Sequence, residues 1–392
     1  MFGSKTGFLK KRKKQAFLIN VFLLAAFCSF GLAQQKTSVP DTVAQIIKQV
    51  QQKYRPDKRI SRFEIISRLE GDTLILSGET LSADAKSELI ARLNAETDYQ
   101  IEDSLMMLPD AALGENIYGV VRVSVAQLRR NPDVIHEIVD QAIMGTEVKV
   151  LKIADRFWAY CQLDDDYLGW MMISSLEMGD INFLENWRKQ DKLIVTANYG
   201  QIWERRKEQG LSVSDVVLGN ILVNKGKKRS WYHVALADGR TGYIDASLVI
   251  EEQKYFAHLH PTAESMIALA WKFLGFPYLW GGRSTKGFDC SGFTQTVYKM
   301  HGITLPRDAN MQVKSGVAVT IDDSFKSVKP GDLLFFGRDL DHIFHVGMYL
   351  GDAKFIHSDG MVRINSFNPK DENFSEYRMK GLQAVRRILT NE

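Results

Sequence analysis

Cysteine is scarce in this sequence, and the cysteines that occur lie in unrelated segments. Cys28, Cys161 and Cys290 allow at most one disulfide bond. Cys161 lies in the alternating run RFWAYCQL, where we expect a small apolar residue of a strand. Cys290 follows the glycine-rich loop of GGRSTKGFDCSGF, so it is either a buried thiol or a nucleophile.

The first residues lack an apolar run long enough for a membrane anchor. The run AFLINVFLLAAFCSFGLA falls short of the roughly 20 residues that a spanning helix needs. A basic run, Lys10–Lys14, precedes it, and small residues follow it at Gly31 and Ala33. Residues 1–33 therefore have the layout of a secretory signal peptide. We expect export to the periplasm or cell envelope, without stable membrane insertion after cleavage.

Without the predicted signal peptide, the sequence also lacks an excess of basic over acidic residues. Residues 1–33 hold six Lys or Arg and no Asp or Glu, so their loss changes the formal charge from +3 to −3. The composition, 45% hydrophobic and 25% charged, is that of globular proteins, and 392 residues allow two to four domains. A nucleic-acid partner is therefore not expected.

Residues 34–112 alternate between helical and strand patterns, which predicts a small α+β domain. Ser82, followed by an acidic first turn, predicts a helix start. The turn 70–72, Glu-Gly-Asp, lies between two alternating apolar runs and predicts a hairpin. We find no catalytic signature in this part, so a binding or spacer role is expected.

An internal repeat spans residues 113–180 and 181–250. Short alternating strands with polar turns and one anchoring tryptophan in each copy predict two small β-barrels, and the pattern resembles bacterial SH3-like modules. In each copy a tryptophan follows a turn glycine after 12 or 13 residues, and another glycine follows 11 residues later (Gly145, Trp158 and Gly169; Gly219, Trp231 and Gly242).

Residues 251–392 begin with helical patterns and end with strand patterns, which predicts an α+β domain. The loop around Gly287 delivers the chain to Asp289, where an apolar helical periodicity begins. Cys290 is therefore expected in the first helical turn, where the partial positive charge of the helix favours a thiolate.

A reactive thiol also needs an imidazole, and two histidines share the predicted hairpin HVGMYLGDAKFIHS. A three-residue loop, 351–353, makes His357 oppose Gly347 and places His345 on the same face. A two-residue loop is expected to place the imidazoles on opposite faces. With the longer loop, one histidine can act as a base while the other orients it.

The motifs GFPYLWGG, GFDCSGF, GITLPRDANMQ, PGDLLFFG and HVGMYLGDAKFIHS occur in this order. Together they closely resemble the NlpC-type cell-wall peptidases, which are papain-like cysteine hydrolases of bacteria. The resemblance covers about residues 262–388, and about 113–388 with the two SH3-like modules. It implies a multidomain α+β protein whose papain-like catalytic domain is C-terminal.

The resemblance assigns roles to four residues of the predicted active site. It implies that Cys290 is the nucleophile, that His345 is the general base and that His357 holds the base. Tyr278 matches a family tyrosine whose hydroxyl helps to stabilise the oxyanion. For Trp280, substrate binding and aromatic packing both stay open.

The resemblance also implies a substrate, namely the γ-D-glutamyl–diamino acid bond of peptidoglycan stem peptides with a free N-terminal L-alanine. The closed end of the cleft then needs carboxylates that pair with an ammonium group. Asp289 and Glu137 match the family positions for this task, and Tyr167 and Ser291 match residues that line the pocket. The second copy of the repeat has neither Glu137 nor Tyr167.

One motif departs from the family pattern. Relatives often carry Arg-Asp-Ser where this chain has Arg307, Asp308 and Ala309, so one hydroxyl is missing. A contact to the substrate glutamate is lost or supplied elsewhere. For Arg307 and Asp308, a structural ion pair stays open.

We expect a cysteine peptidase that acts through an acyl-enzyme on Cys290. A papain-like amidase or acyltransferase and a non-catalytic wall-binding protein are the alternatives, and the presence of Cys290, His345 and His357 argues against the second. No metal or cofactor is expected, because thiolate–imidazole chemistry needs none. The expected partners are peptidoglycan stem peptides or murein fragments, bound by a monomer.

Overall fold

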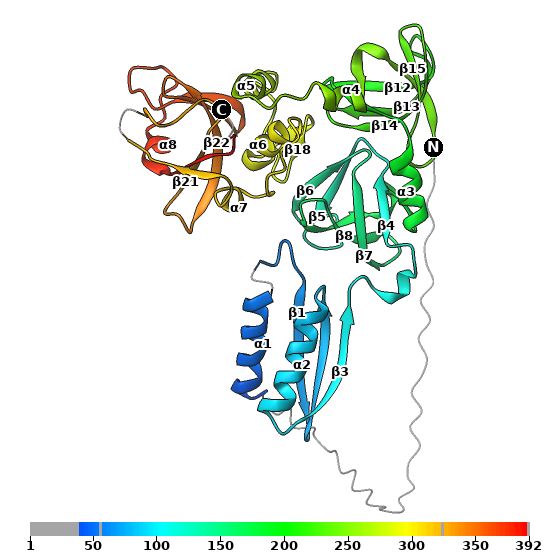
Figure 1. Ribbon diagram of the computed structural model, residues 1–392, viewed down its shortest axis with the longest axis vertical. Helices are drawn as coiled ribbons and strands as arrows, with labels where there is room; N and C mark the ends of the chain where they lie inside the picture. Colours follow the sequence, from blue (N-terminus) through cyan, green and yellow to red (C-terminus); the bar gives the residue numbers. More distant parts are fainter. Residues whose placement is uncertain (1–38, 55–56, 323–324, 390–392) are drawn as a thin grey trace, which may run out of the picture.

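The chain forms four parts in a computed structural model that describes residues 39–54, 57–322 and 325–389 (Figure 1). The predicted signal peptide, residues 1–33, lies outside the described residues. Each part contains a sheet, and helices pack on the sheets of the N-terminal and C-terminal parts, which confirms the predicted multidomain α+β class. Within the described ranges, no helix has the length and apolar composition to cross a membrane.

The N-terminal domain packs two helices on a three-stranded sheet, around a core that includes Val43, Leu74 and Leu89. Ser82 accepts a hydrogen bond from the backbone N–H of Ala85 at 3.1 Å, which confirms the predicted helix start. The predicted hairpin is also confirmed. The elements are α1 (Asp41–Tyr54), β1 (Phe63–Glu70), β2 (Thr73–Thr80), α2 (Ala83–Glu96) and β3 (Gln100–Met107), with β1 antiparallel and β3 parallel to β2.

The first SH3-like domain is a seven-stranded sheet with the order β10-β4-β7-β8-β9-β5-β6. Cys161 is a free, buried thiol on β8, as the alternating pattern predicts. The strands are β4 (Tyr118–Val121), β5 (Val125–Arg129), β6 (Ile138–Ile143), β7 (Glu147–Ala154), β8 (Trp158–Gln162), β9 (Leu168–Met172) and β10 (Leu176–Gly179), with short helices η1 (Ala111–Leu113) and η2 (Ile173–Ser175).

The second SH3-like domain repeats this topology. Its sheet order, β13-β12-β16-β15-β14-β11-β17, is the first order reversed when each strand is matched to its counterpart, so the internal repeat is confirmed. The linker helix is α3 (Ile181–Lys189), and the domain comprises β11 (Lys192–Val195), β12 (Tyr199–Arg205), β13 (Gln209–Val217), β14 (Ile221–Lys228), β15 (Trp231–Ala235), β16 (Thr241–Asp245), η3 (Ala246–Leu248) and β17 (Val249–Glu251).

The C-terminal domain places helices against a six-stranded sheet with the order β20-β25-β21-β22-β23-β24 (Figure 1). Phe293 and Val297 of α6 share a buried core with Leu333 and Val346 of the sheet. The elements are α4 (Glu252–Ala257), α5 (Ala263–Trp271), β18 (Arg283–Ser284), β19 (Gly287–Phe288), α6 (Cys290–Lys299), α7 (Ala309–Gln312), β20 (Val317–Val319), β21 (Leu333–Gly337), β22 (Ile343–Gly351), β23 (Lys354–Asp359), β24 (Met361–Ser366), α8 (Glu376–Gly381) and β25 (Leu382–Arg387).

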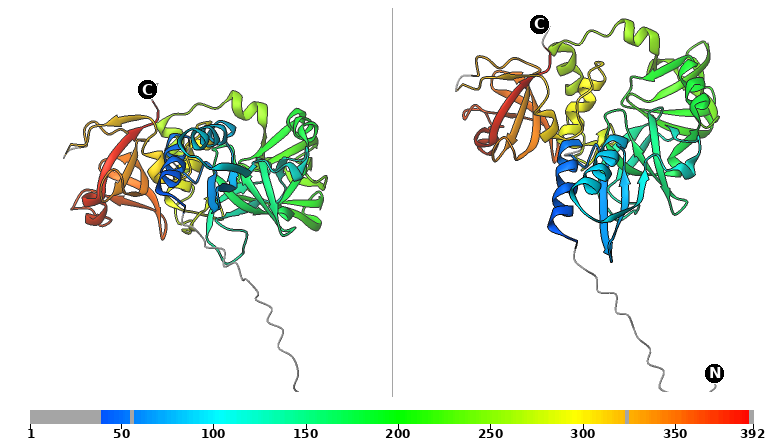
Figure 2. Two further views of the ribbon diagram at one scale, coloured as in Figure 1. Left: turned by 90° about the horizontal axis from the view of Figure 1, so that it is seen from below. Right: turned by 60° about the horizontal axis from the view of Figure 1, so that its bottom comes forward.

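The N-terminal domain is fixed to the first SH3-like domain by an apolar cluster. Leu108 and Leu81 pack with Trp158, Tyr160 and Trp170 of the SH3-like sheet. The N-terminal domain also lies next to the helical side of the C-terminal domain (Figure 2). Three domains therefore meet near the N-terminus of α6.

Candidate active site

Cys290 is the first residue of helix α6, as the sequence predicts. The preceding residue, Asp289, caps the helix by accepting a hydrogen bond from the backbone N–H of Gly292 at 2.7 Å. The thiol is buried, with 7% of the residue exposed. It lies against strand β22, where a hydrogen bond from the backbone N–H of Val346 lowers its pKa. The helix start and the sheet together fix its position.

The predicted preference for a thiolate is wrong for this arrangement. Burial and, to a smaller extent, the neighbouring Asp289 carboxylate raise the pKa of Cys290 to about 12. The N–H groups of Val346 and Ser291 and the charge of Arg307 lower the pKa, but they do not offset burial. The thiol is therefore protonated at neutral pH and needs a base to become a nucleophile.

The two predicted histidines meet, although the turn between their strands has two residues, the case in which the sequence analysis expects the imidazoles on opposite faces. The turn has two residues, Asp352 and Ala353, both with positive φ, and Gly351 pairs with Lys354. A β-bulge at Leu350 then inserts one extra residue and restores the predicted register. His345 and His357 therefore share a face in spite of the shorter loop.

The ring nitrogens of the two histidines form a hydrogen-bonded chain that ends on Asn365. His345 Nε2 lies 2.8 Å from His357 Nδ1, and His357 Nε2 lies 2.9 Å from Asn365 Oδ1. The Asn365 amide donates from Nδ2 to the carbonyl oxygen of Asn373, so its oxygen faces His357. His357 therefore carries its proton on Nε2, and His345 carries its proton on Nε2 as well. Nδ1 of His345 is left as the proton acceptor.

Both imidazoles are held neutral. Burial lowers the pKa of His357 to about 4 and lowers that of His345 well below its usual range. The Arg378 guanidinium adds to this effect for both rings. Phenylalanine rings enclose the pair, with Phe336 5.7 Å from His345 and Phe355 5.0 Å from His357 between ring centroids. A neutral imidazole can accept the thiol proton.

Acid is expected to destabilise the fold because His357 is buried as a neutral imidazole. The pKa of His357 is about 4 in the folded chain and 6.5 in the ordinary case, so between these values the unfolded chain binds one proton more. The free energy of unfolding therefore decreases as the pH is lowered, by about 2 kcal/mol from pH 7 to pH 5. Thermal unfolding at pH 7 and pH 5 measures this. His357→Gln should lose part of this acid sensitivity, and the control His342→Gln, at an exposed site, should keep it. If His357→Gln is as sensitive to acid as the wild type, His357 is not the buried neutral imidazole that we describe.

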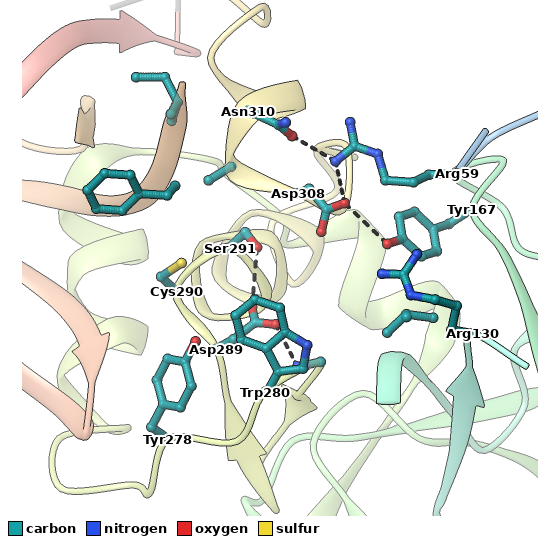
Figure 3. A pocket seen from close by; sticks show the side chains of 15 residues that line it. Arg59, Arg130, Tyr167, Tyr278, Trp280, Asp289, Cys290, Ser291, Asp308 and Asn310 are labelled. Carbon is teal, nitrogen blue, oxygen red and sulfur yellow. Dashed lines mark hydrogen bonds and ion pairs between the residues drawn. The ribbon is translucent and has the colours of Figure 1, made fainter. Parts of the chain in front are cut away.

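A pocket of about 280 Å³ opens beside Cys290 at the junction of three domains (Figure 3). Tyr278 points its hydroxyl toward Cys290, and Trp280 lies at the rim with 61% of its surface exposed. The residues that line the pocket are Arg59, Arg130, Val139, Tyr167, Tyr278, Trp280, Gly281, Asp289, Cys290, Ser291, Asp308, Ala309, Asn310, Ile343 and Phe344.

Asp289 and Ser291 border the pocket, but their polar atoms are engaged inside the protein. The buried Arg307 donates from Nη2 to Asp289 Oδ2 at 2.5 Å and from Nη1 to Ser291 Oγ at 3.0 Å. Arg307 also donates from Nε to Asp140 Oδ1 of β6 at 2.6 Å. Arg307 thus pairs with Asp289 and Asp140, and the ion pair with Asp308 that the sequence left open is not formed.

Asp308 faces the pocket and is held by residues of two other domains. Its Oδ2 accepts hydrogen bonds from Arg59 Nη1 at 2.7 Å and from the Tyr167 hydroxyl at 3.2 Å (Figure 3). Arg59 Nη1 also donates to Asn310 Oδ1 at 2.8 Å. Tyr167 therefore lines the pocket as predicted.

Glu137 lies outside the pocket lining. It is exposed, and it forms an ion pair with Arg130, whose side chain lines the pocket. The predicted contact between Glu137 and a substrate ammonium therefore competes with this ion pair.

Comparisons with known proteins agree with this geometry. Residues 275–382 match the NlpC/P60 family, and residues 128–176 match the bacterial dipeptidyl-peptidase SH3 domain. The C-terminal domain belongs to the NlpC/P60 family. The NlpC/P60 domain holds the cysteine and both histidines, so the protein is a cysteine peptidase.

Individual relatives cover different shares of the chain. Dipeptidyl-peptidase 6 of Lysinibacillus sphaericus is 27% identical over 66% of this chain and 94% of its own length. Gamma-D-glutamyl-L-lysine dipeptidyl-peptidase of Bacillus subtilis is 50% identical over 33% of this chain and 42% of its own length. A crystal structure of an NlpC/P60 family protein from Bacillus cereus covers 69% of this chain and 99% of its own, with 27% identity and a TM-score of 0.59.

The sequence interpretation missed three polar residues of the site. Asn365 of β24 orients the histidines. The Asp359-Gly360 turn could have predicted that Asn365 lies near His357, because this turn fixes the register of β23 and β24. Arg59 and Arg130 line the pocket from outside the NlpC/P60 domain, and no local pattern marks either of them.

Proposed function

We propose that the protein hydrolyses the bond between γ-D-glutamate and a diamino acid in peptidoglycan stem peptides that carry a free N-terminal L-alanine. The observation that carries this proposal is the hydrogen-bonded chain from His345 through His357 to Asn365, beside a buried cysteine in a pocket that holds a carboxylate, Asp308. The name of the Bacillus subtilis relative supports the choice of bond.

The proposed reaction starts from a neutral thiol and a neutral imidazole. Sγ of Cys290 attacks the γ-carbonyl carbon of D-glutamate while its proton passes to Nδ1 of His345. The imidazolium then gives this proton to the leaving amine as the C–N bond breaks, which leaves a thioester on Cys290. Water gives a proton to Nδ1 and attacks the thioester, and that proton returns to the sulfur when the dipeptide leaves.

Two groups are proposed to stabilise the oxyanion of the tetrahedral intermediate. One is the backbone N–H of Cys290 at the start of α6, and the other is the hydroxyl of Tyr278. Burial and the neighbouring Cys290 raise the pKa of Tyr278, so the phenol keeps its proton and remains a donor.

The ammonium group of the substrate is proposed to bind Asp308. Asp289 and Glu137 were the predicted partners, but both oxygens of Asp289 accept hydrogen bonds from Arg307, and Glu137 forms an ion pair with Arg130. Asp308 lines the pocket, and one of its oxygens makes no hydrogen bond within the described part of the chain. A charge-assisted hydrogen bond to this oxygen selects for a free amine.

The proposed specificity is tested with L-Ala-γ-D-Glu-L-Lys and its N-acetylated form. Acetylation removes the positive charge and adds bulk, so kcat/KM is expected to fall by about 100-fold or more, the value of a lost charged hydrogen bond. Chromatography of the released lysine measures both rates. Equal rates on the two peptides contradict the proposed role of Asp308.

A further inference from the structure

We propose that the N-terminal domain completes the substrate-binding site through Arg59, which positions Asp308 for the ammonium group of the substrate. This inference rests on the proposed function, because it assigns the binding of the free amine to Asp308. Arg59 lies in the segment before β1, in a part of the chain for which the sequence predicts only a binding or spacer role.

Asp308 needs outside help to hold its orientation. It precedes helix α7, yet its side chain makes no capping hydrogen bond to that helix, which has only four residues. Arg59 and Tyr167 both donate to Oδ2, and Oδ1 has no hydrogen-bond partner among the residues that the structure describes (Figure 3). Fixing Oδ2 leaves Oδ1 turned to the pocket, where it can accept from an ammonium.

Arg59 is itself held firmly. Asp57 takes a bidentate pair of hydrogen bonds, from Arg59 Nε at 3.0 Å and from Nη2 at 2.6 Å. The carbonyl oxygen of Arg59 accepts from the backbone N–H of Leu168 at 2.8 Å, and Ile60 packs against the core of the first SH3-like domain. The guanidinium therefore reaches Asp308 from a backbone anchored on a neighbouring domain.

The charged side chains around Asp308 leave a net negative charge at the pocket, which favours a cationic ligand. Asp57 compensates the charge of Arg59, and Glu137 compensates that of Arg130, while both partner carboxylates lie outside the pocket lining. Arg307 compensates Asp289. The carboxylate of Asp308 thus keeps a net negative charge at the pocket, in spite of two arginines in the lining.

Replacing Arg59 is expected to weaken binding of the free-amine peptide without disabling the thiol. Arg59→Ala should raise KM for L-Ala-γ-D-Glu-L-Lys by about 10- to 100-fold and change kcat by less than about threefold. The already low kcat/KM of the N-acetylated peptide should change by less than about twofold, because that peptide has no ammonium group. Arg59→Lys keeps one charge and should recover part of the loss.

Two controls separate positioning from general damage. Arg68→Ala removes an arginine of the same domain that is 60% exposed and pairs with Glu70, and it should leave KM unchanged. The rate of Cys290 alkylation by iodoacetamide, together with the melting temperature, should match the wild type in Arg59→Ala. If these match and KM is unchanged or falls, or if kcat falls instead of KM rising, the inference is wrong. If the wild type itself does not prefer the free amine, the proposed function fails instead.

Discussion

Replacing Cys290 with alanine is expected to lower kcat/KM for L-Ala-γ-D-Glu-L-Lys by about 10,000-fold or more, because the step that forms the thioester loses its nucleophile. The fold should not change, since alanine fits at the first position of α6 and the Asp289 cap does not involve the thiol. The measurement is the steady-state rate of lysine release at equal concentrations of folded protein, with melting temperatures that match.

Cys161→Ala is the matched control for this variant. Cys161 is a buried free thiol like Cys290, but it lies within the core of the first SH3-like domain, and burial raises its pKa without any charged neighbour. Its replacement should leave kcat/KM within about twofold of the wild type. A Cys290→Ala variant as active as the wild type, or an equal loss in both variants, contradicts the assignment of Cys290 as the nucleophile.

Replacing Arg307 with methionine is expected to lower the free energy of unfolding by about 3–5 kcal/mol, which is the cost of leaving buried carboxylates without their partner. Arg307 is 1% exposed and joins Asp289 of the NlpC/P60 domain to Asp140 of the first SH3-like domain. Burial already raises the pKa of Asp140 to about 6 in the presence of this arginine. Thermal unfolding, followed by circular dichroism, measures the loss.

Arg188→Met is the control for the loss of an arginine from an ion pair. Arg188 is 56% exposed, and it pairs with Glu147 at 2.6 Å between helix α3 and strand β7. Removing an exposed pair of this kind should cost about 0–1 kcal/mol. Equal melting temperatures for Arg307→Met and the wild type are incompatible with the buried network that we describe.

Much of the catalytic centre follows from short-range sequence patterns. The loop before Asp289 predicts the position of Cys290 at a helix start, and hairpin geometry predicts the contact between His345 and His357. The expectation that a two-residue turn separates the imidazoles was wrong, because a β-bulge at Leu350 supplies the residue that the shorter turn lacks.

The electrostatics of the site could not be predicted from the sequence. The protonation of Cys290 depends on how deeply packing buries the thiol, and a helix start alone does not reveal this. Our proposal that Asp308, and not Asp289, binds the ammonium group depends on which carboxylate Arg307 reaches. Arg59 is 249 residues from Asp308 along the chain and belongs to another domain, so only the folded structure brings them together.

The proposed hydrolysis through a thioester on Cys290 is tested by the identity of the cleaved bond and by the fate of the acyl group. L-Ala-γ-D-Glu-L-Lys is incubated with the wild type in water enriched in ¹⁸O, and the products are identified by mass spectrometry. We predict lysine and L-Ala-D-Glu with a single ¹⁸O in the γ-carboxylate. Cleavage between alanine and glutamate, or transfer of the dipeptide to an amine without ¹⁸O incorporation, would contradict this prediction.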